Sequence, residues 1–220
     1  MSNFFNMDNA FFTFLGKVCD VIFLSLIWIV FCIPIITIGP ANTALYYACV
    51  KVIRRERGYV FREFFKSFKL NFKRGAIIGV ILTVIITILS LDIFAARAAF
   101  TGSSSVNSIM FGIYLALTLF VISISVYIFP LLSRFDMSVK QLFKASAFMS
   151  LRHFIPYTLG ILVLLALGVL GVFFIPILIF IIPAAVTICY SLLMEKVLKK
   201  YMPTDENEEE DSSKDQWYLE

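Results

Sequence analysis

The sequence predicts an all-α, polytopic integral membrane protein, a helix bundle, and three observations predict this class. Hydrophobic residues make up 60% of the 220 positions, and the mean hydropathy is +0.90. Only 15% of the residues are charged, whereas soluble domains contain about 25%. Several apolar blocks reach the roughly 20 residues that a helix needs to cross about 30 Å of hydrocarbon.

The apolar blocks divide into five predicted spans. The last block, 154–194, has no charge over 41 residues and is too long for one helix. Gly168, Gly171 and Pro176 lie near its middle, and proline suits the first turn of a new helix, so we divide the block there. Pro183 is expected to kink the last span. The predicted spans are residues 18–38, 75–95, 109–132, 154–171 and 174–194.

The distribution of Lys and Arg predicts the orientation of these spans. Segment 51–74 contains nine basic residues and segment 134–152 contains four, so both are expected in the cytoplasm. The turn after the second span has only Arg97, and the turn near Phe173 has no charge, which places both outside. The N-terminus is therefore expected outside and the C-terminus inside. The first residues lack the pattern of a signal peptide, so we expect them in the mature chain.

The segment PIITIGPANTALYY contains a helix break where the first span ends, at Pro34, Gly39 and Pro40. Pro40 suits the first turn of a new helix over residues 41–55. About twelve membrane-compatible residues, 41–52, are too few to cross the bilayer. We interpret this helix as lying on the cytoplasmic side and beginning within the membrane boundary. The alternative is a sixth, short span with the N-terminus inside.

A basic amphipathic helix is predicted directly before the second span. Its phenylalanines recur at three- and four-residue spacing, and its basic residues occupy another face. An anionic inner leaflet attracts each such charge by about 1 kcal/mol, so we interpret the helix as lying on that leaflet. Docking of a cytoplasmic partner subunit is a compatible alternative, and nucleic acid is not an expected partner. The residues are Phe61, Phe64, Phe65, Lys66, Phe68, Lys69, Phe72 and Lys73.

Small residues predict close helix packing along the second span. They recur at four-residue spacing, which allows the backbones of two helices to approach. We interpret this stripe first as intramolecular packing and second as a homodimer face. Its members are Gly75, Gly79, Thr83 and Thr87.

Three charges are expected at similar depth near the outer boundary: Asp20, Asp92 and Arg97. A carboxylate inside the membrane is costly unless it is paired, and the planar Arg side chain can reach two carboxylates. We therefore hypothesise that Arg97 bridges Asp20, Asp92 or both, which would tie the first span to the second. The alternative is that each side chain extends into the headgroup region.

The sequence contains no recognisable enzymatic motif, so we expect a protein that is not an enzyme and binds no cofactor or metal. GxxxxGK, HExxH and GxSxG patterns are absent from the sequence. His153 is the single histidine and is interpreted as a residue of the inner interface. The four cysteines lack CxxC spacing, so they indicate neither a disulfide framework nor a zinc site.

The order of these motifs resembles a known family. PIITIGPANTALY is followed by a basic helix and then by FREFFKSFKLNFKRG, and FFTFLGKVCDVIFLSLIW stands near the N-terminus. This order resembles the YesL family of bacterial membrane proteins, domain of unknown function 624, over most of residues 4–200. The resemblance implies a bacterial plasma membrane protein with a role near carbohydrate uptake, and it implies no catalytic residues.

Two functions are therefore expected for residues 1–203, the membrane domain. The first is an accessory or permease-like component of carbohydrate uptake, whose helices 61–74 and 139–152 dock transporter subunits. The second is a membrane sensor or regulatory scaffold that signals through its cytoplasmic helices and tail. The tail, 204–220, is expected to be disordered, because it is strongly acidic and cannot bury enough apolar surface to offset the entropy of ordering.

Overall fold

The computed structural model describes residues 10–98, 105–153 and 157–201, and within them the chain is helical with no strand. The predicted all-α class is confirmed. The acidic tail, 204–220, lies outside the described residues. The α-helices are α1 (Ala10–Cys32), α2 (Ile38–Ala48), α3 (Val60–Leu70), α4 (Phe72–Ala98), α5 (Ser105–Arg134), α6 (Val139–Arg152), α7 (Leu159–Phe174) and α8 (Ile182–Leu198).

The helix α2 is the central element of the fold. It contacts α1, α3, α4, α5 and α8, and nine of its 11 residues are buried. The helix predicted after the proline and glycine break is present, although it begins at Ile38 rather than Ala41. It continues without interruption into the π-helix η3 (Cys49–Arg54). PIITIGPANTALYY therefore changes the direction of the chain and then forms the buried centre of the protein.

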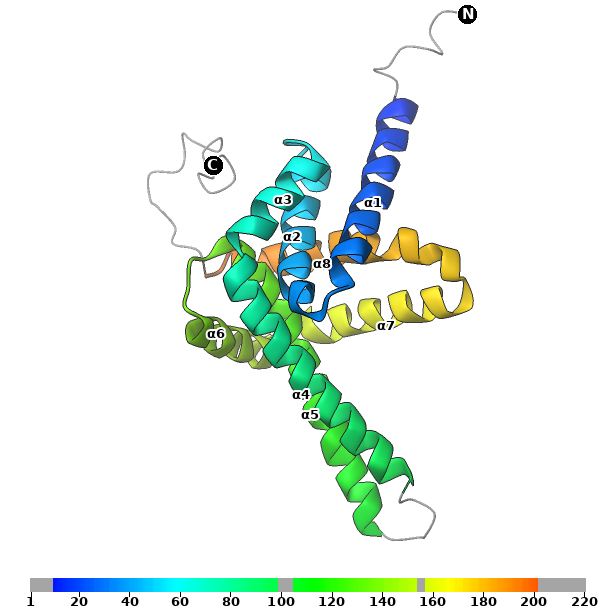
Figure 1. The fold of residues 1–220 in the computed structure, drawn as a ribbon, viewed down its shortest axis with the longest axis vertical. Helices are drawn as coiled ribbons and strands as arrows, with labels where there is room; N and C mark the ends of the chain where they lie inside the picture. Colours follow the sequence, from blue (N-terminus) through cyan, green and yellow to red (C-terminus); the bar gives the residue numbers. More distant parts are fainter. Residues whose placement is uncertain (1–9, 99–104, 154–156, 202–220) are drawn as a thin grey trace, which may run out of the picture.

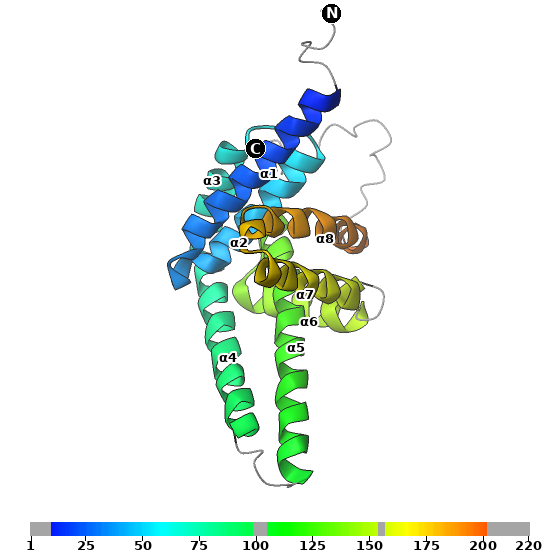
Figure 2. The ribbon, with the colours of Figure 1, turned by 90° about the vertical axis from the view of Figure 1, so that its right-hand side faces the viewer.

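The long helices do not form one parallel bundle. The helices α4 and α5 lie side by side as a hairpin that projects downward in Figures 1 and 2. The helix α1 extends upward from the N-terminal end of α2. The helices α7 and α8 form a second contacting pair that lies across the molecule in Figure 1. The central helix α2 thus joins three apolar arms that point in different directions.

Among the described residues, three helices are long and apolar enough to cross a membrane, and they correspond to the first three predicted spans. Their apolar segments are Leu15–Cys32, Phe72–Arg97 and Ile109–Arg134. The fourth predicted span corresponds to α7, a shorter apolar helix of 16 residues. These features are compatible with a membrane protein.

The fifth predicted span is not one continuous helix. A 3-10 helix, η6 (Pro176–Phe180), precedes α8, and Pro183 lies in the first turn of α8. The structure therefore has a break directly before α8 rather than the predicted kink within a helix at Pro183. Proline is tolerated there because the first N–H groups of a helix have no intrahelical partner to lose.

Candidate functional site

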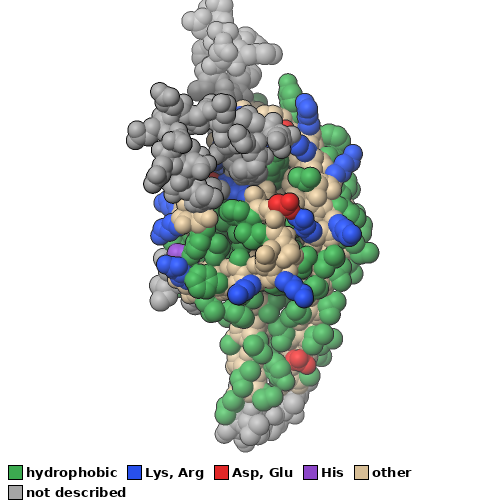
Figure 3. All heavy atoms as spheres, turned by 90° about the vertical axis from the view of Figure 1, so that its left-hand side faces the viewer, with side chains coloured by type: hydrophobic (Ala, Val, Ile, Leu, Met, Phe, Trp, Pro, Cys, Tyr) green, Lys and Arg blue, Asp and Glu red, His purple; other side chains and the backbone are tan. Residues whose placement is uncertain are grey.

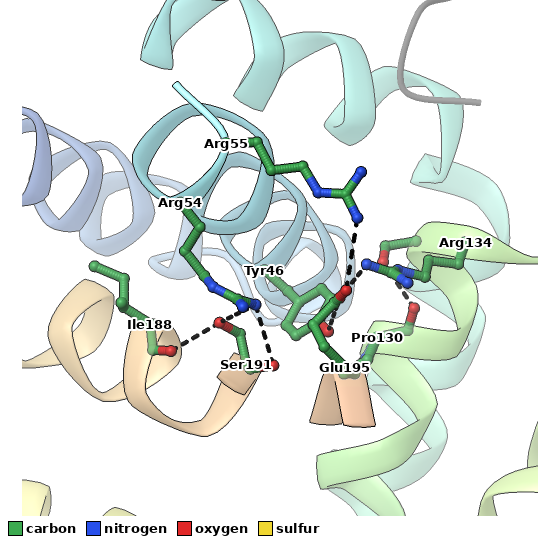
Figure 4. Close-up of polar contacts among 9 residues, drawn as sticks. Tyr46, Arg54, Arg55, Pro130, Arg134, Ile188, Ser191 and Glu195 are labelled. Carbon is green, nitrogen blue, oxygen red and sulfur yellow. Dashed lines mark hydrogen bonds and ion pairs between the residues drawn. The ribbon is translucent and has the colours of Figure 1, made fainter. Parts of the chain in front are cut away.

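Charged side chains from three separate parts of the chain meet in the interior. We call Tyr46, Arg55, Arg134 and Glu195 the inner charge cluster. Tyr46 donates a hydrogen bond of 3.1 Å from its hydroxyl to Glu195 Oε1, and Arg134 forms an ion pair with the same oxygen. Arg55 Nη2 lies 3.8 Å from Glu195 Oε2. Figure 4 shows how these side chains converge on Glu195.

Burial makes the inner charge cluster energetically important. The side chain of Arg134 is 2% exposed and that of Glu195 is 9% exposed. Charges removed from water are costly unless they are paired and hydrogen-bonded, and loss of one partner leaves the other charge buried and uncompensated. Because Tyr46 and Arg55 flank η3, Arg134 ends α5 and Glu195 lies in α8, the cluster fixes the positions of these three segments relative to one another.

Two further contacts join α2 and η3 to α8 beside the inner charge cluster. Arg54 Nη1 donates to the backbone oxygen and to the hydroxyl of Ser191, both at 3.3 Å (Figure 4). The ring of Tyr46 stacks on that of Tyr190, with centroids 5.6 Å apart. The contacts between η3 and α8 therefore include charge, hydrogen bonds and aromatic packing.

A second buried ion pair joins η3 to α3. Lys51 Nζ lies 2.8 Å from Glu63 Oε2 and 3.2 Å from the Tyr47 hydroxyl, and both charged side chains are 8% exposed. Burial disfavours the ammonium group, but hydrogen bonds to Glu63 and Tyr47 outweigh that effect, so the pKa of Lys51 is raised. Lys51 therefore stays charged at neutral pH and holds α3 against η3.

The aromatic stripe of α3 lies partly inside the protein. Phe64 and Phe68 are buried in a core shared with α1, α2 and η3. The ring of Phe31 in α1 lies 5.1 Å from that of Phe65 and 4.9 Å from that of Phe68. The interpretation that this stripe enters the inner leaflet is therefore wrong for Phe64 and Phe68, because α1 covers them. Phe61 and Phe72 remain exposed.

The basic residues of the predicted helix are placed differently from one another. Lys69 and Lys73 are exposed and Lys66 is half-buried. Lys73 belongs to the first turn of α4, because α3 ends at Leu70 and α4 begins at Phe72. The predicted helix is thus two helices that meet at Asn71.

The small-residue stripe packs inside the chain at its first two members. A Cβ placed on Gly39 would lie 2.0 Å from the Gly75 carbonyl oxygen, and one placed on Gly79 would lie 2.7 Å from the Gly39 nitrogen. The backbones of α2 and α4 therefore touch directly, beside Pro40. Thr83 is half-buried and Thr87 is exposed, so the contact does not continue along α4. The helix break and the stripe are two sides of one contact.

The structure does not bring the outer charges together. Asp20 lies in α1, whereas Asp92 and Arg97 lie in α4, and these helices diverge from α2 in opposite directions in Figure 1. The described residues include no ion pair between α1 and α4. The hypothesis that Arg97 ties Asp20 to the second span is therefore contradicted, because it assumed two parallel neighbouring helices.

His153 is buried at the C-terminal end of α6. Its Nε2 lies 3.1 Å from the Tyr201 hydroxyl. Burial disfavours the imidazolium ion, and the nearby charges of Lys200 and Arg152 add to this effect, so the pKa of His153 is lowered. The residue is neutral at pH 7 and links α6 to the end of α8.

An apolar cavity of about 450 Å³ lies between α1, α2, α5, α7 and α8. Its polar groups are few, and two of them are already paired, because Trp28 Nε1 donates to Asn42 Oδ1 at 2.9 Å. A sugar would require several hydrogen-bonding groups. This lining therefore does not resemble a sugar path.

Sequence reasoning missed the inner charge cluster. From the sequence, Arg134 counts only as one of the positive charges of segment 134–152, and Glu195, which directly follows the long apolar block, receives no role. The available signal was a single acidic residue, Glu195, among the basic residues that follow the last span. Its pairing with Arg134 depends on tertiary structure.

Comparison with known proteins gives a match to one protein family over part of the chain. The model of a family described as "Protein of unknown function, DUF624" matches residues 21–93. This match confirms the resemblance to domain of unknown function 624 over the segment that contains most of α1, all of α2 and α3, and most of α4. No curated protein and no solved structure matches the chain.

Proposed function

We propose that the chain is an integral protein of the bacterial plasma membrane, in which the α4–α5 hairpin lies in the bilayer and the basic segments at its base lie in the cytoplasm. Figure 3 supports this placement, because Lys and Arg side chains gather on the body of the molecule while hydrophobic side chains cover most of the projecting hairpin. The hairpin is formed by α4 and α5, and the basic segments lie at its base. This distribution agrees with the excess of positive charge on cytoplasmic surfaces.

The remaining helices do not line up with the α4–α5 hairpin. Helix α1 points away from it in Figure 1, and Lys17 near the start of α1 pairs with Glu56 in the basic segment 51–74. The pair α7 and α8 lies across the molecule in the same view. The predicted five crossings with an external N-terminus are therefore not part of this proposal.

The proposed activity is that of a non-enzymatic accessory component of carbohydrate uptake. The observation that carries it is the exposed surface of α3 and α6, where apolar side chains stand among cations. Phe61 and Leu70 are exposed on α3, and Phe148 and Leu151 are exposed on α6. Exposed apolar side chains ringed by charge are typical of docking surfaces. The link to carbohydrate uptake rests on the resemblance to the YesL family.

The second candidate function is a membrane sensor or regulatory scaffold. It is favoured by the inner charge cluster, because Glu195 lies in α8 shortly before the acidic tail begins. A partner that binds the tail and shifts α8 would act directly on Arg134 in α5 and on η3. The same cytoplasmic surface would then carry a signal rather than hold a transporter together.

A photocrosslinking residue at Phe148, introduced into the full chain in its native cells, tests these proposals. We expect crosslinks to the ATPase or permease subunit of a sugar importer, because α6 is exposed at the proposed docking surface. Crosslinks to a kinase or transcriptional regulator that do not depend on sugar would favour the sensor. The matched control is Phe94, exposed at the far end of α4. Equal yields of cytoplasmic crosslinks from the two positions would contradict docking through α6.

A further inference from the structure

A basic cavity of about 600 Å³ opens between the corner where α3 meets α4 and the C-terminal end of α5. The charged side chains in its lining are Lys66, Lys73, Arg74, Arg134 and Asp136. Four cations and one carboxylate give the lining a formal charge of +3. The cavity is separate from the apolar cavity and from the exposed surface of α6.

The cations that line the basic cavity differ in whether they already form an ion pair with a carboxylate. Arg74 pairs with Asp136, and Arg134 pairs with Glu195 outside the lining. Lys66 and Lys73 form no ion pair with a carboxylate among the described residues. Two ammonium groups therefore face the cavity without a carboxylate partner, whereas the charges of Arg74 and Arg134 are balanced by Asp136 and Glu195.

The backbone at the start of α4 adds to the positive character of this cavity. The helix α4 has 27 residues and begins at Phe72, so its N-terminal end lies in the lining beside Lys73. The N-terminus of a long helix carries a partial positive charge and favours anions. Asn71, at the same corner, donates from Nδ2 to the backbone oxygen of Ser67 at 3.2 Å, which stabilises the turn.

We propose that the basic cavity binds a phosphate ester, with Lys66 and Lys73 as its principal ligands. Lysine binds phosphate as a compact point charge, and a phosphate ester supplies both the negative charge and the several acceptor oxygens that this lining complements. The source is either the headgroup of an anionic phospholipid or a free phosphate compound. The headgroup source requires the proposed membrane orientation, whereas binding of phosphate itself does not.

Titration of the purified full chain in an uncharged detergent tests this proposal. The probes are short-chain phosphatidylglycerol below its micelle concentration and inorganic phosphate, and the readout is the melting temperature at constant ionic strength. Both probes are compared with a short-chain diacylglycerol, which lacks phosphate. A response to phosphatidylglycerol alone identifies a lipid headgroup, and a response to inorganic phosphate identifies a site for free phosphate. No response beyond that of the diacylglycerol overturns the proposal.

Variants assign the response to the cavity. Lys66→Ala with Lys73→Ala is expected to weaken binding by about tenfold or more, because two charge-assisted contacts are lost. Lys66→Arg with Lys73→Arg should retain binding. The matched control is Lys69→Ala, because Lys69 is exposed on α3, the helix that also carries Lys66, and does not line the cavity. Binding that is unchanged in the double alanine variant overturns the proposal.

A measurement on the unaltered protein avoids any dependence on the folding of variants. Lysine acylation followed by mass spectrometry reports the accessibility of each ammonium group. Saturating probe should protect Lys66 and Lys73 and leave Lys69 as reactive as before. Equal reactivity of Lys66 and Lys73 with and without probe contradicts binding in the cavity.

Discussion

Glu195→Ala is expected to lower the free energy of unfolding by about 3–5 kcal/mol, because it leaves the buried Arg134 without its carboxylate partner. The Arg134 side chain is 2% exposed and cannot recover its hydration without moving α5. Tyr46 would also lose the acceptor of its hydroxyl hydrogen bond. Denaturant titration of the purified protein in detergent, followed by circular dichroism, measures the loss.

The control for this prediction is Glu56→Ala. Glu56 pairs with Lys17, but its side chain is 65% exposed, so its removal should change stability by no more than about 0.5 kcal/mol. Glu195→Gln should fall between the two variants, because it preserves the shape of the side chain and removes the charge. Similar losses for Glu195→Ala and Glu56→Ala would show that the inner charge cluster does not hold the helices together.

Gly39→Ala is expected to have the second large effect, at the upper end of the roughly 1–3 kcal/mol that overpacking costs. The added methyl group would lie 2.0 Å from the carbonyl oxygen of Gly75, far inside van der Waals contact. The obstacle is backbone, which cannot rotate away as a side chain can. The helices α2 and α4 would therefore have to separate, and the core around α2 would loosen.

Gly112→Ala is the matched control for the glycine contact. Gly112 lies in α5, and a Cβ placed there meets no atom within 4 Å. Alanine is favoured over glycine in helices by about 1 kcal/mol, so this variant should be neutral or more stable. The melting temperatures of the two variants in the same detergent measure the difference. If Gly39→Ala melts at or above Gly112→Ala, direct contact between α2 and α4 is refuted.

The predictable parts of this fold are those that depend on local sequence. Hydrophobic runs of about 20 residues identified α1, α4 and α5, and proline with glycine identified the break before α2. The glycine spacing on α4 predicted a packing face, because residues four apart share one side of a helix. It could not predict which segment approaches that face, and the partner, Gly39, lies 36 residues earlier.

The errors share a physical cause, which is that sequence patterns do not show what covers a helix face. The phenylalanines of α3 have the spacing of a membrane-surface helix, and the same spacing suits a helix packed on α1. Asp20 and Arg97 have similar depths only if the first two long helices run side by side. The pairing of Arg134 with Glu195 joins residues 61 positions apart, so no local pattern predicts it.

Thiol accessibility in intact cells tests most directly the central claim that α3 and α6 face the cytoplasm in a membrane protein. Single cysteines at Lys69, Lys144 and Ser104 would be introduced in a chain whose native cysteines are replaced. Lys69 and Lys144 are exposed on α3 and α6, and Ser104 lies between α4 and α5. We predict that an impermeant reagent labels only position 104 until the membrane is permeabilised. Labelling at positions 69 and 144 in intact cells, with protection at position 104, would contradict the proposed orientation.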